Sequence, residues 1–160
     1  MTDLFTYTTY LSLLLIVIAL TYKCAVIPST NIDTIKIPKL SAYHFLALII
    51  IAIVVGFRHN VGVDWEGYTV IFDDIKDDIE SYDTEMAYHY INKLISNFGG
   101  NYQIMFSLVA FLSWYFIFKS VPNYLLPLTL FFIFTDEVFF WSMNGVRQFA
   151  ALSIFFSFLF

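Results

Sequence analysis

The chain has 160 residues, of which 59% are hydrophobic and only 13% are charged. A soluble domain is roughly 25% charged, so this composition excludes an ordinary soluble protein and predicts a membrane protein. The net charge of −5, with the acids gathered between residues 64 and 85 and no polybasic run, argues against a nucleic-acid partner.

The first apolar run covers residues 4–22 and is predicted to be a helix that crosses the bilayer. Its only early charge is Asp3, so it lacks the positive start of a cleaved signal peptide, and we expect it to be retained. Cys24 is the one cysteine, which rules out a disulfide within the chain. We interpret it as a small residue at a helix end.

Four further apolar runs follow, and their backbone amides can be paired within lipid only if they too are helical. With the first run, the predicted spans are residues 4–22, 41–57, 102–118, 125–141 and 145–160. The sequence therefore predicts an all-α, polytopic integral membrane protein with about five transmembrane helices in a single membrane domain, residues 1–160. The last run stops in the middle of apolar sequence, so we expect the chain to be the N-terminal part of a longer protein.

Residues 58–100 form a long polar segment between the second and third spans. Apolar residues recur at helical spacing from Tyr88 to Phe98, and Gly99-Gly100 follows, which predicts an amphipathic helix. A second short helix with an acidic face is predicted from the apolar residues Val70, Ile71, Phe72, Ile75 and Ile79. We expect both helices to lie on the membrane surface or to cap the bundle.

The orientation follows from the short loop at residues 23–39, which carries Lys23, Lys36 and Lys39 against Asp33. Positive charge in short loops marks the cytoplasmic side. The sequence therefore predicts that the N-terminus and residues 58–100 lie on the outer side of the membrane.

Charged residues near the outer helix ends are the candidates for chemistry. Arg58 follows the second span and Arg147 begins the fifth. An arginine near lipid is costly, so it usually faces a cavity or a partner, although a guanidinium can also reach the headgroups. Two such arginines would suit a phosphate or pyrophosphate, because the guanidinium fork matches phosphate oxygens.

Carboxylates at the same end could orient these arginines or deprotonate a sugar hydroxyl. The candidates are Asp64 with Glu66, or Asp136 with Glu137, the latter pair being equally consistent with a solvated loop tip. The acids between residues 73 and 85 are predicted to form a solvated face, since they lack the spacing of a calcium loop. No metal site and no cofactor is predicted.

Three stretches of the sequence resemble, in this order, the signatures of the EpsG family, bacterial polysaccharide polymerases of the Wzy type. They are Gly56-Phe57-Arg58-x-x-Val61-Gly62-x-Asp64-x-x-x-Tyr68-x-x-x-Phe72, then Glu85-x-x-Tyr88-x-x-Ile91-Asn92-Lys93-Leu94-Ile95, and finally Phe140-Trp141-Ser142-x-x-x-Gly145-Val146-Arg147-Gln148-x-x-Ala151. The resemblance extends over essentially the whole chain, and members of the family are usually longer.

The resemblance implies an enzyme that acts on polyprenyl-pyrophosphate-linked oligosaccharide repeats at the outer face of the membrane. The growing chain would pass from its lipid pyrophosphate to a hydroxyl of the next repeat, without a nucleotide sugar. Arg58, Asp64 and Arg147 would then be catalytic. The residues expected to bind substrate are His59, Glu66, Tyr68, Glu85, Tyr88, Asn144 and Gln148.

Two other functions are compatible with the sequence. A flippase or another transporter of lipid-linked oligosaccharide would favour charges near the bilayer midplane, where these spans have almost none. A non-catalytic membrane subunit that works with other polysaccharide-assembly proteins is the second alternative. The product, whether exopolysaccharide, capsule or O-antigen, stays open.

Overall fold

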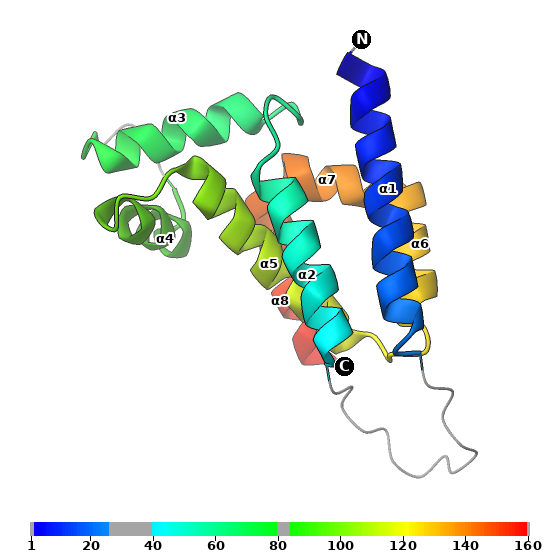
Figure 1. Cartoon of the computed structure of the whole chain (residues 1–160). Coiled ribbons are helices and arrows are strands. Elements are labelled where there is room, and N and C mark those ends of the chain that lie inside the picture. Colours follow the sequence, from blue (N-terminus) through cyan, green and yellow to red (C-terminus); the bar gives the residue numbers. More distant parts are fainter. Residues whose placement is uncertain (1, 26–39, 80–83, 160) are drawn as a thin grey trace.

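A computed structural model describes residues 2–25, 40–79 and 84–159 of the chain. These residues form eight helices and no strand (Figure 1). The helices are α1 (Thr2–Tyr22), α2 (Ala42–Gly56), α3 (Trp65–Lys76), α4 (Met86–Asn97), α5 (Tyr102–Ser120), α6 (Leu126–Thr135), α7 (Val138–Asn144) and α8 (Val146–Leu159). The all-α fold class predicted from the apolar runs is confirmed.

The long helices stand side by side as a bundle (Figure 1). Helix α5 packs against both α2 and α8, while α1 packs against α2 and α6. The N-terminus lies at the end of the bundle where α3 and α4 project to one side, and the C-terminal end of α8 lies at the opposite end (Figure 1). We call the end that carries the N-terminus, α3 and α4 the site end. Helix α2 ends there, and helices α5 and α8 begin there.

The centre of the bundle is filled by large side chains from several helices. Trp114 and Phe118 of α5, Ile51 of α2 and Leu130 of α6 are all buried. Near the site end α2 and α5 come so close that a Cβ on Gly56 would lie 1.7 Å from the Ser107 Oγ. Only glycine allows this approach, and it fixes where α2 ends against α5.

Two of the described helices, α1 from Leu4 and α5, are long and apolar enough to cross a membrane. The pair α6 and α7 would supply a third span if it is counted as one, although the two helices meet at a bend of 69°. Helices α2 and α8 are apolar but shorter, with 15 and 14 residues. The chain is a helical membrane protein, and the count of five spans stays a prediction.

The bend between α6 and α7 lies inside the predicted span 125–141. Asp136 and Glu137 separate the two helices, and Glu137 adopts a left-handed backbone conformation with φ of 61°. Two adjacent carboxylates resist burial in lipid, which explains why the helix is interrupted at this point. As a result α7 runs across the site end rather than along the bundle (Figure 1).

The two short helices expected in residues 58–100 are present as α3 and α4. They cap the site end of α5 through a buried cluster that includes Phe72 of α3, Ile95 of α4 and Phe106 of α5. The buried face of α4 consists of Tyr88, Asn92 and Ile95. The sequence predicted helix α4 but not that Asn92 would be part of its packed face.

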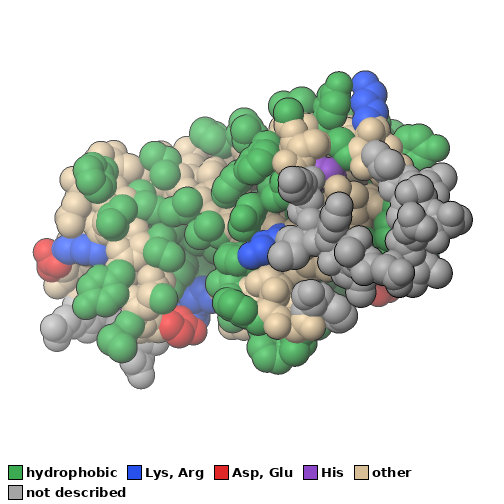
Figure 2. Space-filling view, turned by 90° about the horizontal axis from the view of Figure 1, so that it is seen from below, with side chains coloured by type: hydrophobic (Ala, Val, Ile, Leu, Met, Phe, Trp, Pro, Cys, Tyr) green, Lys and Arg blue, Asp and Glu red, His purple; other side chains and the backbone are tan. Residues whose placement is uncertain are grey.

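Hydrophobic side chains are spread over the whole described surface seen from below, between backbone and other uncharged side chains, and charged side chains appear at few places (Figure 2). This distribution fits a bundle surrounded by lipid. Of the loop at residues 23–39, on which the predicted orientation depends, residues 26–39 lie outside the described part of the chain.

Candidate functional site

The site is built around the corner between α7 and α8. Helix α7 ends at Asn144 and α8 begins at Val146, with Gly145 between them. The loop after α2 is bonded to this corner at two points. The Arg58 Nη2 donates a hydrogen bond to the Met143 carbonyl oxygen at 2.7 Å, and the Val63 amide donates one to the Asn144 Oδ1 at 2.9 Å. Two segments that lie more than 80 residues apart in the sequence are thereby joined.

Gly62 makes the second of these contacts sterically feasible. Its φ is +101°, and a Cβ at this position would lie 2.7 Å from the Asn144 Oδ1. A residue with a side chain would be strained in this backbone conformation and would also push Asn144 away. The glycine of the first signature is therefore explained by its close packing against the third signature.

Arg58 is buried, with 4% of its surface exposed. Its guanidinium lies over the Phe106 ring, 4.5 Å from the ring centroid, and its Nε and Nη1 have no hydrogen-bond partner among the described residues. Burial lowers the pKa of Arg58 to about 10, so the group is still charged at neutral pH. A buried charge with a single hydrogen bond is costly, and it calls for a functional explanation.

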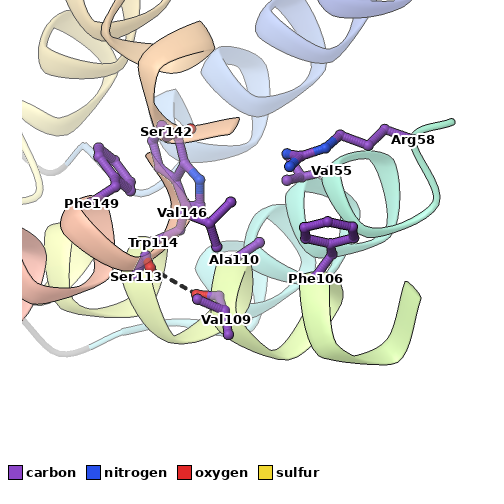
Figure 3. Close-up of a pocket in the computed structure, with 10 residues that line it drawn as sticks. All are labelled: Val55, Arg58, Phe106, Val109, Ala110, Ser113, Trp114, Ser142, Val146 and Phe149. Carbon is purple, nitrogen blue, oxygen red and sulfur yellow. Dashed lines mark hydrogen bonds between the residues drawn. The ribbon is translucent and has the colours of Figure 1, made fainter. Parts of the chain in front are cut away.

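The Arg58 side chain lines a small cavity between α2, α5, α7 and α8 (Figure 3). The cavity measures about 10 Å³, and the hydroxyl-bearing side chains of Ser113 and Ser142 also line it. That volume is close to the minimum that one water molecule requires. This cavity is therefore too small to hold a pyrophosphate. The role of Arg58 as a direct pyrophosphate ligand stays a prediction from the sequence.

Arg147 is the more accessible arginine. It lies in the first turn of α8, and 26% of its side chain is exposed. Its Nη1 forms an ion pair with the Glu85 Oε2 just before α4. The guanidinium also lies near the rings of Tyr68 and Tyr88, 5.9 Å and 5.5 Å from their centroids. Residues from all three signature stretches thus meet at one guanidinium.

The two tyrosines form a rigid support under Arg147. Both are buried, and their ring centroids are 6.1 Å apart in an edge-to-face arrangement. The Tyr88 hydroxyl lies 3.5 Å from the Met105 sulfur, and burial raises the pKa of Tyr88 above its ordinary value. Tyr88 is therefore a neutral phenol at neutral pH, and we assign it to positioning Arg147.

Several other predicted site residues lie at the same end but on the surface. They are His59, Asp64, Glu66 and Gln148. The His59 ring packs edge-on against Trp65, with 4.9 Å between ring centroids. Asp64 directly precedes α3, and within the described residues it forms no ion pair with either arginine.

Asp136 and Glu137 are exposed at the bend between α6 and α7. The described part of the chain has two ion pairs, Arg147 with Glu85 and Lys93 with Asp78, and neither involves this acidic pair. The carboxylate that orients an arginine in this structure is therefore Glu85. No three His, Cys, Asp or Glu side chains of the described residues come together as a metal site.

Two contributors to the site were missed by reasoning from the sequence. Phe106, which lies under Arg58, is one of many aromatic residues in the apolar runs, and nothing in the sequence distinguishes it. Asn92 donates a hydrogen bond from its Nδ2 to the Tyr88 carbonyl oxygen at 2.9 Å. Its position four residues after Tyr88, on the same helix face, was the available signal.

The family model of the EpsG family matches residues 41–160, which is most of the chain. The chain belongs to the EpsG family. The match begins near the start of α2, so it leaves out α1, whereas the resemblance was expected over essentially the whole sequence. Membership of the EpsG family points to a function related to polysaccharide polymerisation. Neither the curated proteins nor the solved structures compared with the chain gave a match.

Proposed function

We propose that this EpsG-family chain is part of an enzyme that polymerises polyprenyl-pyrophosphate-linked oligosaccharide repeats at the outer face of the bacterial cytoplasmic membrane. The observation that carries the proposal is the meeting of the three signature stretches at Arg147. Sequence stretches that are far apart but converge on one accessible cation are typical of a site for an anionic ligand.

In the proposed reaction Arg147 binds the pyrophosphate of the lipid-linked donor. A guanidinium can hold two phosphate oxygens at once, and it stabilises the charge that develops as the pyrophosphate leaves. Tyr68 and Tyr88 limit how far the guanidinium can move. Glu85 holds it in place before the substrate arrives, and the pyrophosphate then competes with that carboxylate.

The transfer itself requires a base. A hydroxyl of the acceptor repeat loses its proton to a carboxylate, its oxygen forms the new bond to the anomeric carbon, and the bond from that carbon to the pyrophosphate oxygen breaks. The pyrophosphate leaves on its lipid with the electron pair. Asp64 is our proposed base, because it is exposed at the site end and follows the loop that is bonded to the α7–α8 corner. Glu66, in the first turn of α3, is the alternative.

Arg58 has a different role in this proposal. Its hydrogen bond to the Met143 carbonyl oxygen fixes the end of α7, and thereby the direction in which α8 presents Arg147. We therefore propose Arg58 as a positioning residue, because the buried guanidinium is separated from the surface.

The test is the ladder of surface polysaccharide made by a strain whose gene for this protein carries Arg147→Ala, with Lys119→Ala as the matched control. Lys119 is an exposed cation near the opposite end of α5. We expect Arg147→Ala to reduce the ladder to single repeats on their lipid anchor, at normal abundance of the protein, and Lys119→Ala to leave the ladder unchanged. Loss of all surface polysaccharide would instead indicate an export step. An unchanged ladder in Arg147→Ala would refute the proposal.

A further inference from the structure

Helices α3 and α4 pack against each other but expose very different surfaces. The exposed face of α3, opposite its buried Tyr68, Phe72 and Ile75, carries the acids Glu66 and Asp73 beside Val70, and the exposed Asp77 directly follows the helix. The exposed surface of α4 carries a row of large hydrophobic side chains spaced four residues apart. These are Met86, Tyr90, Leu94 and Phe98, each more than half exposed.

Helix α4 therefore has three faces rather than two. Tyr88, Asn92 and Ile95 pack toward α3 and α5. At about 100° per residue, the exposed apolar row lies on a second side of the helix, and His89 and Lys93 lie on a third. Lys93 forms an ion pair with Asp78 and donates a hydrogen bond to the Ile75 carbonyl oxygen at 3.4 Å. The polar side of α4 thus faces the end of α3, and the apolar row is directed elsewhere.

The position of the two helices indicates what covers that row. In Figure 1 α3 lies above α4, farther from the end of the bundle where the C-terminus lies. Seen from below, the part of the molecule that α3 and α4 form shows several hydrophobic side chains (Figure 2). After the turn at Gly99-Gly100 the chain continues directly into α5, a span whose own exposed side chains include Ile104, Leu108 and Leu112.

We propose that the apolar row of α4 is a membrane-binding surface, seated among the acyl chains of the leaflet beside the bundle, while the acidic face of α3 remains in water. The row is followed within a few residues by the membrane span α5, and an exposed apolar patch beside a membrane span is stabilised by lipid. The proposal that this surface binds the membrane does not depend on the proposed function. If both proposals are correct, Glu85 and Arg147 lie at headgroup level, where a lipid-linked pyrophosphate would approach from the bilayer.

The test uses a fluorescent nitrobenzoxadiazole probe on single cysteines in a Cys24→Ala background. Leu94→Cys and Phe98→Cys report on the apolar row, and Asp73→Cys on the acidic face of α3 is the matched control. The full protein is reconstituted in phosphatidylethanolamine–phosphatidylglycerol vesicles, opened by freezing and thawing so that solutes reach both faces. Two quenchers are compared, an acyl-chain nitroxide lipid and aqueous iodide.

We expect the nitroxide lipid to quench the probes at positions 94 and 98 several-fold more than the probe at position 73, with the opposite order for iodide. Equal iodide quenching at positions 94 and 73 would overturn the proposal. Protection of position 94 from both quenchers would also overturn it, because it would show that protein covers the row. Neither readout depends on polysaccharide synthesis, so this inference can fail while the proposed function stands, and the reverse.

Discussion

The Arg58 guanidinium donates a hydrogen bond to the Met143 carbonyl oxygen at 2.7 Å, which joins the end of α2 to the end of α7 across 85 residues of sequence. This bond is made by a buried charge with no carboxylate beside it among the described residues. Such an arrangement is a poor way to gain stability, since the penalty for removing an ion from water is several kcal/mol.

Arg58→Met is therefore expected to keep, or to raise, the melting temperature of the purified protein in detergent. The methionine side chain would still pack on Phe106, and the loss of a charged hydrogen bond, about 1.5–3 kcal/mol, is offset by the removal of the buried charge. The same variant should shorten the polysaccharide ladder, because the end of α7 is no longer fixed. A large fall in melting temperature, with a ladder that only follows protein abundance, would show that Arg58 is purely structural.

Gly62→Ala is expected to destabilise the protein by about 1–2 kcal/mol, because a side chain in the left-handed region is strained. The new Cβ would also meet the Asn144 Oδ1 and weaken the bond from the Val63 amide. The matched control is Gly67→Ala in α3, where an added Cβ meets nothing within 4 Å and helix propensity improves by up to about 1 kcal/mol. Thermal melts of the two variants, measured side by side, check this prediction. A Gly62→Ala protein as stable as Gly67→Ala would contradict the close contact between Gly62 and Asn144.

Gly56→Ala is expected to separate α2 from α5 at the site end, because its Cβ would lie within 3 Å of both the side chain and the backbone of Ser107. Overpacking of this kind costs about 1–3 kcal/mol. Adding Ser107→Gly should restore part of the loss, since it removes the side chain that is met first. Thermal melts of the two single variants and the double variant measure the coupling. Strictly additive effects would mean that the two helices do not cross at these residues.

Glu85→Gln is expected to leave the melting temperature nearly unchanged, because the Glu85 side chain is 63% exposed and such an ion pair contributes at most about 1 kcal/mol. Its effect should appear in binding instead. Without the competing carboxylate, a polyprenyl pyrophosphate should bind about fivefold more tightly, as measured by titration of the protein in nanodiscs. Weaker binding would show that Glu85 is needed to aim Arg147 rather than to compete for it.

The sequence was sufficient to predict the helices but not how they are arranged. Continuous apolar runs require helices in lipid, so the elements and the two short helices at the site end followed from pattern alone. Asp136-Glu137 was visible as an interruption, yet the 69° bend depends on how α7 packs across the bundle. For α4, the apolar spacing predicted an amphipathic helix, but it did not show that Leu94 and Phe98 would be exposed while Asn92 is buried.

For the candidate site, too, the sequence identified residues but not how they are paired. Arg58 and Arg147 were identified from their positions at helix ends, and both lie at the site end. From the sequence, the carboxylates proposed to orient an arginine were Asp64 with Glu66, or Asp136 with Glu137. The ion pair of Arg147 with Glu85 depends on tertiary packing, which the sequence does not show. Glu85 reaches Arg147 because α4 is held against α3 and α5 by Tyr88 and its neighbours.

The most direct test of the central claim is the affinity of the protein in nanodiscs for a polyprenyl-pyrophosphate-linked oligosaccharide, compared between Arg147→Ala and the Lys119→Ala control. Losing charged hydrogen bonds worth about 1.5–3 kcal/mol should weaken binding roughly tenfold to a hundredfold in Arg147→Ala. The Lys119→Ala protein should bind as the unchanged protein does, since Lys119 lies near the far end of α5. Equal affinity in the two variants would contradict Arg147 as the pyrophosphate ligand and with it the proposed site.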